Sequence, residues 1–320
     1  MSGRTRRGVQ VPAAAGVLLA VLALAGCGGD QEGAGAQLVV TQDFGTRSIA
    51  DLPQPTTRPG STILELLSAN VPGVRTATIA AQPQLSAVGP VTNATVDGRT
   101  KRWTLFVNGV GEDAEGPGQE LDDNDVVWWD HHDTGAAARV PAVVGSFPAP
   151  FRNGVEGKRM PLRIECSPAD IPACQKVQDA MTAAGVFAAQ GGLQQSITDE
   201  TLRIIVGPWE RIRDDDTARL LEGGPRVSGV YARPTPDGRS IALLDATGKQ
   251  TRELGPGSGL IAATRLRDGQ PVWFITGPDV AGVSAAAQAL DQGNLKDHYA
   301  LAVDDGRAVA VPEVGVAVRP

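Results

Sequence analysis

Four consecutive polar residues, Asp130, His131, His132 and Asp133, have the side chains best suited to metal chemistry. Imidazole nitrogens and carboxylates are ligands for Zn²⁺, Ni²⁺ or Cu²⁺. Successive residues of a strand point to opposite faces, so His131 and His132 can share one ion only where the strand has already ended. The alternative is a polar strand exit, which we favour. We therefore predict no metal site and keep His131, His132 and Asp133 as secondary candidates.

A second group of polar residues is acidic. The segment 112–125 contains seven carboxylates, at Glu112, Asp113, Glu115, Glu120, Asp122, Asp123 and Asp125. Ca²⁺ takes roughly six to eight oxygen ligands, which such a loop can supply. The ligand order of an EF-hand, with its central glycine and terminal glutamate, is absent. A solvated loop that leads into a turn is the favoured interpretation.

The adjacent tryptophans Trp128 and Trp129 are the main candidates for ligand binding. Neighbours on one strand face opposite sides, so one indole faces the core and the other faces outward or a partner. An exposed tryptophan is a frequent binding anchor. The alternative is that this second indole lies beneath residues 130–150. With the nearby turn, the predicted ligand-binding residues are Asn108, Gly109, Trp128 and Trp129.

Known catalytic motifs are missing from the chain. Ser258 lies in Gly255-Pro256-Gly257-Ser258-Gly259, but these glycines do not have the spacing of a nucleophile elbow. The chain contains neither a His-Glu-x-x-His sequence nor a phosphate-binding Gly-Lys loop. Paired carboxylates need no local motif, so a glycosidase-like hydrolase stays open. A protein without catalytic activity is favoured over an enzyme.

The elements that must position these residues are mostly strands. Thr62 offers an N-cap and Glu65 completes a capping box, which predicts a short helix that ends near Asn70. From residue 74 to 129 the pattern is typical of β-strands. Asp97-Gly98 and Asn108-Gly109 are hairpin turn signals within it.

Residues 37–133 resemble the β-grasp domain found at the C-terminus of transcobalamin. The resemblance rests on the segments 62–67, Trp103-Thr104-Leu105-Phe106-Val107-Asn108-Gly109 and 121–129, in that order. It implies a small α+β domain and makes a corrinoid or another flat molecule a candidate ligand. Asn124 stands where relatives commonly have glycine, and asparagine tolerates the same left-handed turn.

The remaining chain predicts a connector over residues 134–159 and an α/β domain over residues 160–320. Strand, Asp-Gly turn and strand follow one another around Asp237 and again around Asp268, and strand–helix units recur beside these hairpins. The fold class is therefore α+β: a β-grasp-like domain followed by a mixed α/β sheet domain. Cys166 and Cys174 flank a short turn-rich segment, which predicts a disulfide.

The N-terminal segment predicts the compartment. Three arginines precede an apolar run and Leu24-Ala25-Gly26-Cys27. This arrangement resembles the bacterial lipoprotein signal, which implies a signal peptide over residues 1–26 and a lipid on Cys27. Residues 27–36 are rich in glycine and predict a flexible tether. Loss of the three arginines takes the net charge from −7 to −10, which argues against a nucleic-acid partner.

Taken together, we expect a protein lipid-anchored at the extracytoplasmic face of a bacterial membrane. It would bind a small molecule or a cell-surface partner through the β-grasp-like domain, without catalysis. No cofactor is predicted with certainty, and a cobalamin-like ligand stays open. The alternatives are an envelope-polymer hydrolase with a carboxylate pair in the second domain, and a structural envelope protein.

Overall fold

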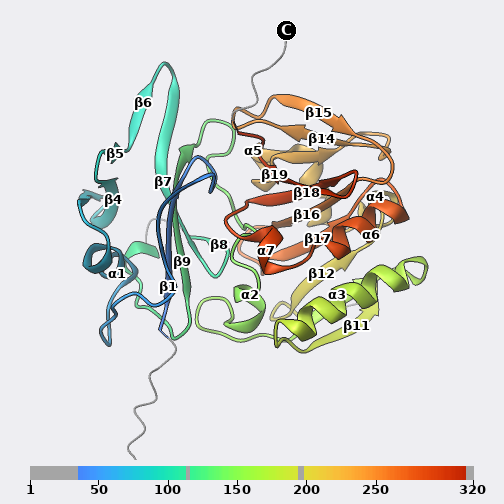
Figure 1. Cartoon of the computed structure of the whole chain (residues 1–320), viewed down its shortest axis with the longest axis horizontal. Coiled ribbons are helices and arrows are strands. Elements are labelled where there is room, and N and C mark those ends of the chain that lie inside the picture. The colour runs from blue at the N-terminus through green and yellow to red at the C-terminus, as the bar shows by residue number, and fades with distance from the viewer. Residues whose placement is uncertain (1–34, 113–115, 194–197, 315–320) are drawn as a thin grey trace, which may run out of the picture. The chain divides into compact units, whose positions relative to one another are not determined.

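The computed structural model describes residues 35–112, 116–193 and 198–314. These residues fall within one compact unit (Figure 1). The fold is mixed α+β, with extensive sheets and short helices, as the sequence predicts at this level.

The first sheet has the strand order β2-β1-β9-β7-β6, with β8 paired to β7. The central pair β1 and β9 is parallel, and the other pairs are antiparallel. The strands are β1 (Gln37–Gln42), β2 (Arg47–Leu52), β6 (Ala94–Val96), β7 (Arg99–Val107), β8 (Val110–Gly111) and β9 (Val126–Asp133).

Helix α1 (Ile63–Asn70) covers one face of this sheet (Figure 1). Its capping box is present as predicted, since Thr62 accepts from the Glu65 amide and Glu65 accepts from the Thr62 amide. The apolar side of α1 packs on Leu38, Leu105 and Trp129. A three-stranded sheet lies beside it, made of β3 (Val74–Ile79), β4 (Gln82–Val88) and β5 (Val91–Thr92).

The second sheet has the order β11-β10-β12-β17-β16-β18-β19. Its first four strands are parallel and the last three pairings are antiparallel. The strands are β10 (Leu162–Cys166), β11 (Ala188–Gly192), β12 (Leu202–Val206), β16 (Gly259–Thr264), β17 (Val272–Thr276), β18 (Ala300–Asp304) and β19 (Arg307–Val311).

The central strands β12, β17, β16 and β18 are buried on both faces, which explains why they are almost continuously apolar. Helices α3 (Ile171–Ala183) and α6 (Val280–Gln288) pack on one face. The other face packs on a small sheet and on the first sheet. The small sheet contains β13 (Ala232–Pro234), β14 (Ile241–Leu244) and β15 (Gln250–Leu254).

Short helices fill the connections. They are α2 (Ala149–Arg152), α4 (Trp209–Ile212), α5 (Pro225–Ser228), α7 (Gln292–Leu295), η1 (Gly116–Gly118), η2 (Pro168–Asp170) and η3 (Ala218–Gly223). The four predicted Asp-Gly or Asn-Gly turns all join antiparallel strands.

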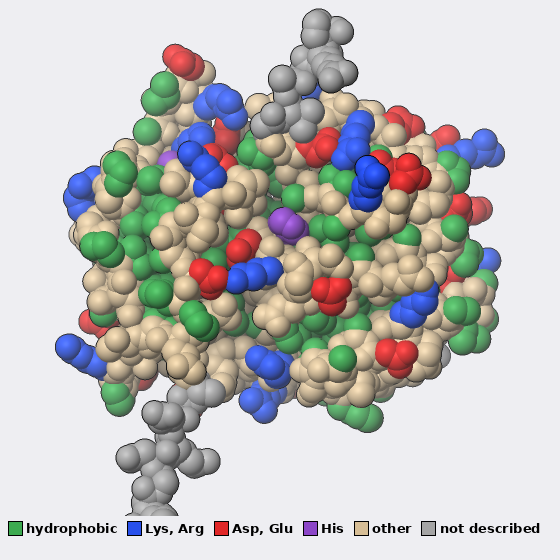
Figure 2. Space-filling model, in the orientation of Figure 1, with side chains coloured by type: hydrophobic (Ala, Val, Ile, Leu, Met, Phe, Trp, Pro, Cys, Tyr) green, Lys and Arg blue, Asp and Glu red, His purple; other side chains and the backbone are tan. Residues whose placement is uncertain are grey.

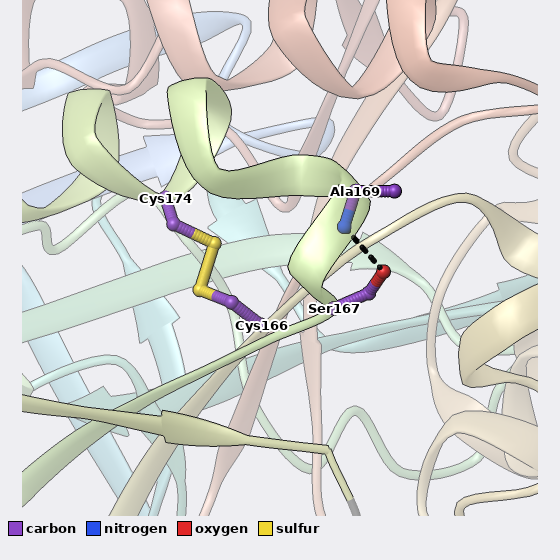
Figure 3. Close-up of a disulfide and its surroundings, with 4 residues drawn as sticks. All are labelled: Cys166, Ser167, Ala169 and Cys174. Carbon is purple, nitrogen blue, oxygen red and sulfur yellow. Dashed lines mark hydrogen bonds between the residues drawn. A yellow bond between two sulfur atoms is a disulfide. The ribbon is translucent and has the colours of Figure 1, made fainter.

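The predicted disulfide is present. Cys166 ends β10 and Cys174 lies near the start of α3, so the bond joins a strand to the helix that follows it (Figure 3). Between them, the Ser167 hydroxyl accepts from the Ala169 amide and begins η2 (Figure 3).

The predicted connector, residues 134–159, packs as part of the core. Ala137, Val140 and Val143 are buried against the first sheet, and Phe147 and Phe151 are buried against the second. Part of this segment continues the first sheet locally, because Ala142 forms an antiparallel bridge to Val110 of β8.

Candidate ligand-binding cleft

The two tryptophans lie on opposite faces of β9, as their spacing predicts, but neither is exposed. Trp128 is 1% exposed and packs between the sheets against Phe106 and Tyr299. Trp129 is 2% exposed and packs in the core beneath α1. Of the two alternatives for the second indole, an outward-facing ring is therefore wrong, and Trp128 lies in one buried cluster with Val140 and Val143.

Asn108 and Gly109 form the turn between β7 and β8. The Asn108 side chain donates to the Asp125 carboxylate at 2.8 Å and accepts from the Val126 amide at 2.9 Å. Gly109 has φ +80°, and a Cβ there would lie 2.9 Å from the Val143 carbonyl oxygen. The geometry of the turn therefore accounts for an asparagine at position 108 and a glycine at position 109.

The side chains of His131, His132 and Asp133 at the end of β9 point to different partners. His131 Nε2 lies 3.0 Å from the Thr92 carbonyl oxygen on the α1 side, and burial lowers the pKa of His131. His132 faces the second sheet, where its Nδ1 lies 3.0 Å from Asp130. Asp133 pairs with Arg99. Within residues 35–112, 116–193 and 198–314, no group of three His, Cys, Asp or Glu side chains is placed to hold a metal.

Asp130 is a fully buried carboxylate that joins the two sheets. Burial alone would raise its pKa, but hydrogen bonds, with that from His132 foremost, lower the pKa below its ordinary value. Its neighbours are Thr41 Oγ1, the Phe44 and Gly45 amides, Tyr299 Oη and His132 Nδ1, at 2.6–3.1 Å. Burial and this carboxylate together raise the pKa of Tyr299.

The acidic segment forms a turn in the part that the structure describes; Asp113 and Glu115 lie outside the described residues. Asp125 accepts from the Asp122 amide at 3.0 Å and from Asn108. Burial raises the pKa of Asp125, and these hydrogen bonds oppose that effect. The carboxylate thus shapes the turn before β9.

A cleft of about 430 Å³ opens along one edge of β7. On that side β6 pairs with Arg99–Lys101 and β8 pairs with Phe106 and Val107. Among the described residues, no strand lies opposite residues 102–105. The cleft occupies this gap between β6 and β8.

The walls of the cleft combine aromatic surface with hydrogen-bond donors. Trp103, Leu105 and Trp129 give it apolar surface. Trp129 Nε1 is buried and has no hydrogen-bond acceptor among the described residues. Arg102 and Arg139 also line the cleft, and both are exposed without an ion pair to any described residue. Glu112 lies at the wall as well.

The cleft brings together only part of the predicted site. Of the four predicted ligand-binding residues, Trp129 lines the cleft, whereas Asn108, Gly109 and Trp128 do not. Sequence reasoning missed Arg102 and Arg139, because nothing in the neighbouring sequence shows that this stretch of β7 has no partner strand among the described residues.

Two carboxylates do meet in the second part of the chain, where the hydrolase alternative places its pair; one is on β10 and the other is in the segment that precedes η3. Arg203 binds Glu165 through two hydrogen bonds of 2.8 Å and Asp215 through one of 2.6 Å. The pKa of Arg203 is affected first by burial, which lowers it, but the two carboxylates raise it overall. The single guanidinium balances one of the two negative charges and joins β10, β12 and the segment that precedes η3.

Charges of both signs are interspersed on the face that Figure 2 shows, so selective binding there requires a shaped site rather than a broad field of one sign. None of the described helices has the length and apolar character needed to cross a membrane. Comparison with protein-family models, with characterised proteins and with solved structures finds no match to this chain.

Proposed function

We propose that this chain is a non-catalytic binding protein that holds a small ligand in the cleft at the β7 edge. The observation that carries the proposal is the cleft itself, with its aromatic wall, its buried indole donor and its two arginines. Ligand sites in proteins commonly have volumes of about 300–1,000 Å³ and a few polar groups on an apolar wall. A cavity of about 430 Å³ falls within that range.

We propose further that the first sheet and α1 form a β-grasp domain. The order β2-β1-β9-β7, the parallel central pair and a helix on one face support this assignment. The corrinoid that the resemblance implies stays a candidate. The volume of the cleft favours a smaller molecule, since a corrinoid macrocycle would have to lie across its mouth.

The location proposed for the protein is the extracytoplasmic face of a bacterial membrane, with a lipid on Cys27. The signal peptide, Cys27 and most of the tether lie outside the described residues. The disulfide supports this location, because such bonds persist mainly in oxidising compartments.

The test of binding uses the full chain isolated from its native host. Mass spectrometry and an absorption spectrum of the extracted protein identify a co-purifying ligand, and a corrinoid absorbs visible light. We expect a bound molecule from wild type and at least tenfold less from a Trp129→Phe variant, which removes the Nε1 donor but keeps an aromatic ring. Trp209→Phe is the matched control, since Trp209 is also buried with an unpartnered Nε1 and does not line the cleft. Equal occupancy in all three proteins, or none in wild type even after incubation with host extract, contradicts the proposal.

A further inference from the structure

The strand β3 is an edge strand, paired among the described residues only with β4. Five of its six residues are exposed, and Val74 is half-buried. The other two strands of this small sheet, β4 and β5, lie at the end of the molecule opposite the second sheet, on the left in Figure 1. The free edge of β3 is therefore accessible from outside the molecule.

The turn at the tip of the β3–β4 hairpin determines which backbone groups point outward. Both residues of the turn 80–81 have a positive φ, and Ile79 lies opposite Gln82, so the turn has two residues. The pair that flanks such a turn is hydrogen-bonded, and hydrogen-bonded and non-hydrogen-bonded pairs then alternate along the strands. Pro83 fits this order, because it has no N–H and lies opposite Thr78 in the next pair.

Thr76 and Thr78 consequently turn their N–H and C=O groups away from β4. No described residue makes a hydrogen bond to any of these four groups. Natural sheets protect such edges with charges, prolines or bulges. In β3 a bulge follows Arg75, but beyond it the strand contains only threonine, alanine and isoleucine. Residues 76–79 thus form an unprotected edge with two donors and two acceptors.

This edge is complementary to the same edge of a second copy of the chain. When two β3 strands meet antiparallel with a two-fold axis at Ala77, Thr76 of one copy lies opposite Thr78 of the other. Each of these two pairs exchanges two hydrogen bonds, so all the outward groups of both threonines are used. Cross-strand threonine pairs are favourable. Arg75, the only charged residue of the strand, falls opposite Ile79 rather than opposite its own copy.

We propose that this chain forms a two-fold symmetric dimer through β3, in which the two copies share one antiparallel ladder over residues 75–79. Such a contact uses the same surface of both copies, so it closes on itself and does not extend into a filament. A single pair of strands makes a small interface, which is typical of a dimer in exchange with its monomer. The dimer does not depend on the proposed ligand, because no residue of β3 lines the cleft.

The first experiment places charges in the proposed register and measures dimerisation by sedimentation velocity of the full chain in detergent over a series of concentrations. A Thr76→Glu, Thr78→Glu variant puts glutamates opposite each other and should dimerise about tenfold more weakly than wild type. A Thr76→Lys, Thr78→Glu variant puts lysine opposite glutamate in both pairs and should dimerise at least as tightly as wild type. The control Thr182→Glu, Gln288→Glu adds the same charge as the first variant at exposed helix positions outside β3, and should behave as wild type does.

A second experiment tests the position of the two-fold axis by crosslinking. Residues of a non-hydrogen-bonded antiparallel pair have Cα atoms about 4.5 Å apart, which a disulfide can span. An Ala77→Cys variant of the full chain should therefore form a disulfide-linked dimer on mild oxidation. Thr76→Cys is the matched control, because Thr76 lies one position from the axis and its two copies are too far apart to be joined.

Three results would overturn the proposal. They are a wild-type chain that stays monomeric at the highest concentration reached, a lysine–glutamate variant that dimerises no more tightly than the double-glutamate variant, and equal crosslinking at positions 76 and 77. Ligand binding in the cleft is measured separately, through Trp129. Failure of the dimer therefore leaves the proposed function standing, and failure of ligand binding leaves the dimer standing.

Discussion

The Asp130 carboxylate stays ionised in the core because its surroundings replace water with donors. Replacement by asparagine keeps the size but removes the charge and turns one acceptor into a donor that faces other donors. We expect Asp130→Asn to lower the free energy of unfolding by about 3 kcal/mol. Urea unfolding measures the loss. Asp268→Asn is the control, since Asp268 is exposed in an Asp-Gly turn that asparagine also suits. A loss for Asp130→Asn no larger than that of the control would contradict this role.

The pKa of Asp297 is shifted in the opposite direction from that of Asp130, to a value above its ordinary one. Burial is the main cause that raises its pKa from 3.8 to about 6; Lys296 opposes this shift, and Asp51 and Asp130 add to it. Between these two values the folded chain binds more protons than the unfolded chain, so this group makes stability fall as the pH rises. Asparagine removes the effect and tolerates the φ of +61° at this position. We expect Asp297→Asn to be more stable than wild type by about 1 kcal/mol at pH 7, after solvent screening is allowed for. The gain should shrink as the pH falls toward 4. A gain independent of pH between 4 and 7 would show that packing, not ionisation, is its cause.

At the scale of elements, the disulfide fixes the start of α3 to the end of β10. The two cysteines are separated by 8 positions, and closing a loop of this size contributes about 2.5 kcal/mol through the unfolded chain. We expect a Cys166→Ala, Cys174→Ala double variant to lose about that amount in urea unfolding. Reductant should destabilise wild type to the same level and leave the double variant unchanged. If reductant shifts both proteins equally, its effect does not come from this bond.

Short sequence patterns predicted the helices, strands and turns well. The features that they did not predict depend on contacts between residues distant in the chain. The capping box at Thr62 and the turns at Asp97 and Asn108 depend on a few adjacent residues, so their chemistry is readable in the sequence. The burial of Trp128 depends on Tyr299, which is distant in the chain. The cleft lies beside residues 102–105 of β7, where no described strand pairs, and no local pattern in the sequence indicates this.

In the unit that the structure describes, one apolar layer lies between the two large sheets. Phe106 and Trp128 of the first sheet contact Tyr299 of the second part of the chain, and Phe44, in the turn between β1 and β2, contacts Tyr231. Asp130 accepts from Tyr299 at 3.0 Å within the same layer. Separation of the sheets would expose these rings, at a cost of about 25 cal/mol for each Å² of apolar surface. It would also leave Asp130 without one of its donors. Neither sheet is therefore expected to reach its folded state alone.

This coupling predicts that the described unit unfolds in one step. Tryptophans lie in both sheets, so their fluorescence and the far-ultraviolet circular dichroism should give coincident urea transitions for the full chain. A fragment of residues 35–159, which keeps the first sheet and the segment packed on it, should bind the dye ANS and lack a cooperative transition. Tyr299→Phe in the full chain removes only the hydroxyl group, and it should shift both signals together by about 1–3 kcal/mol. Two separate transitions, or a fragment that melts cooperatively without binding ANS, would show instead that the first sheet is an independent domain.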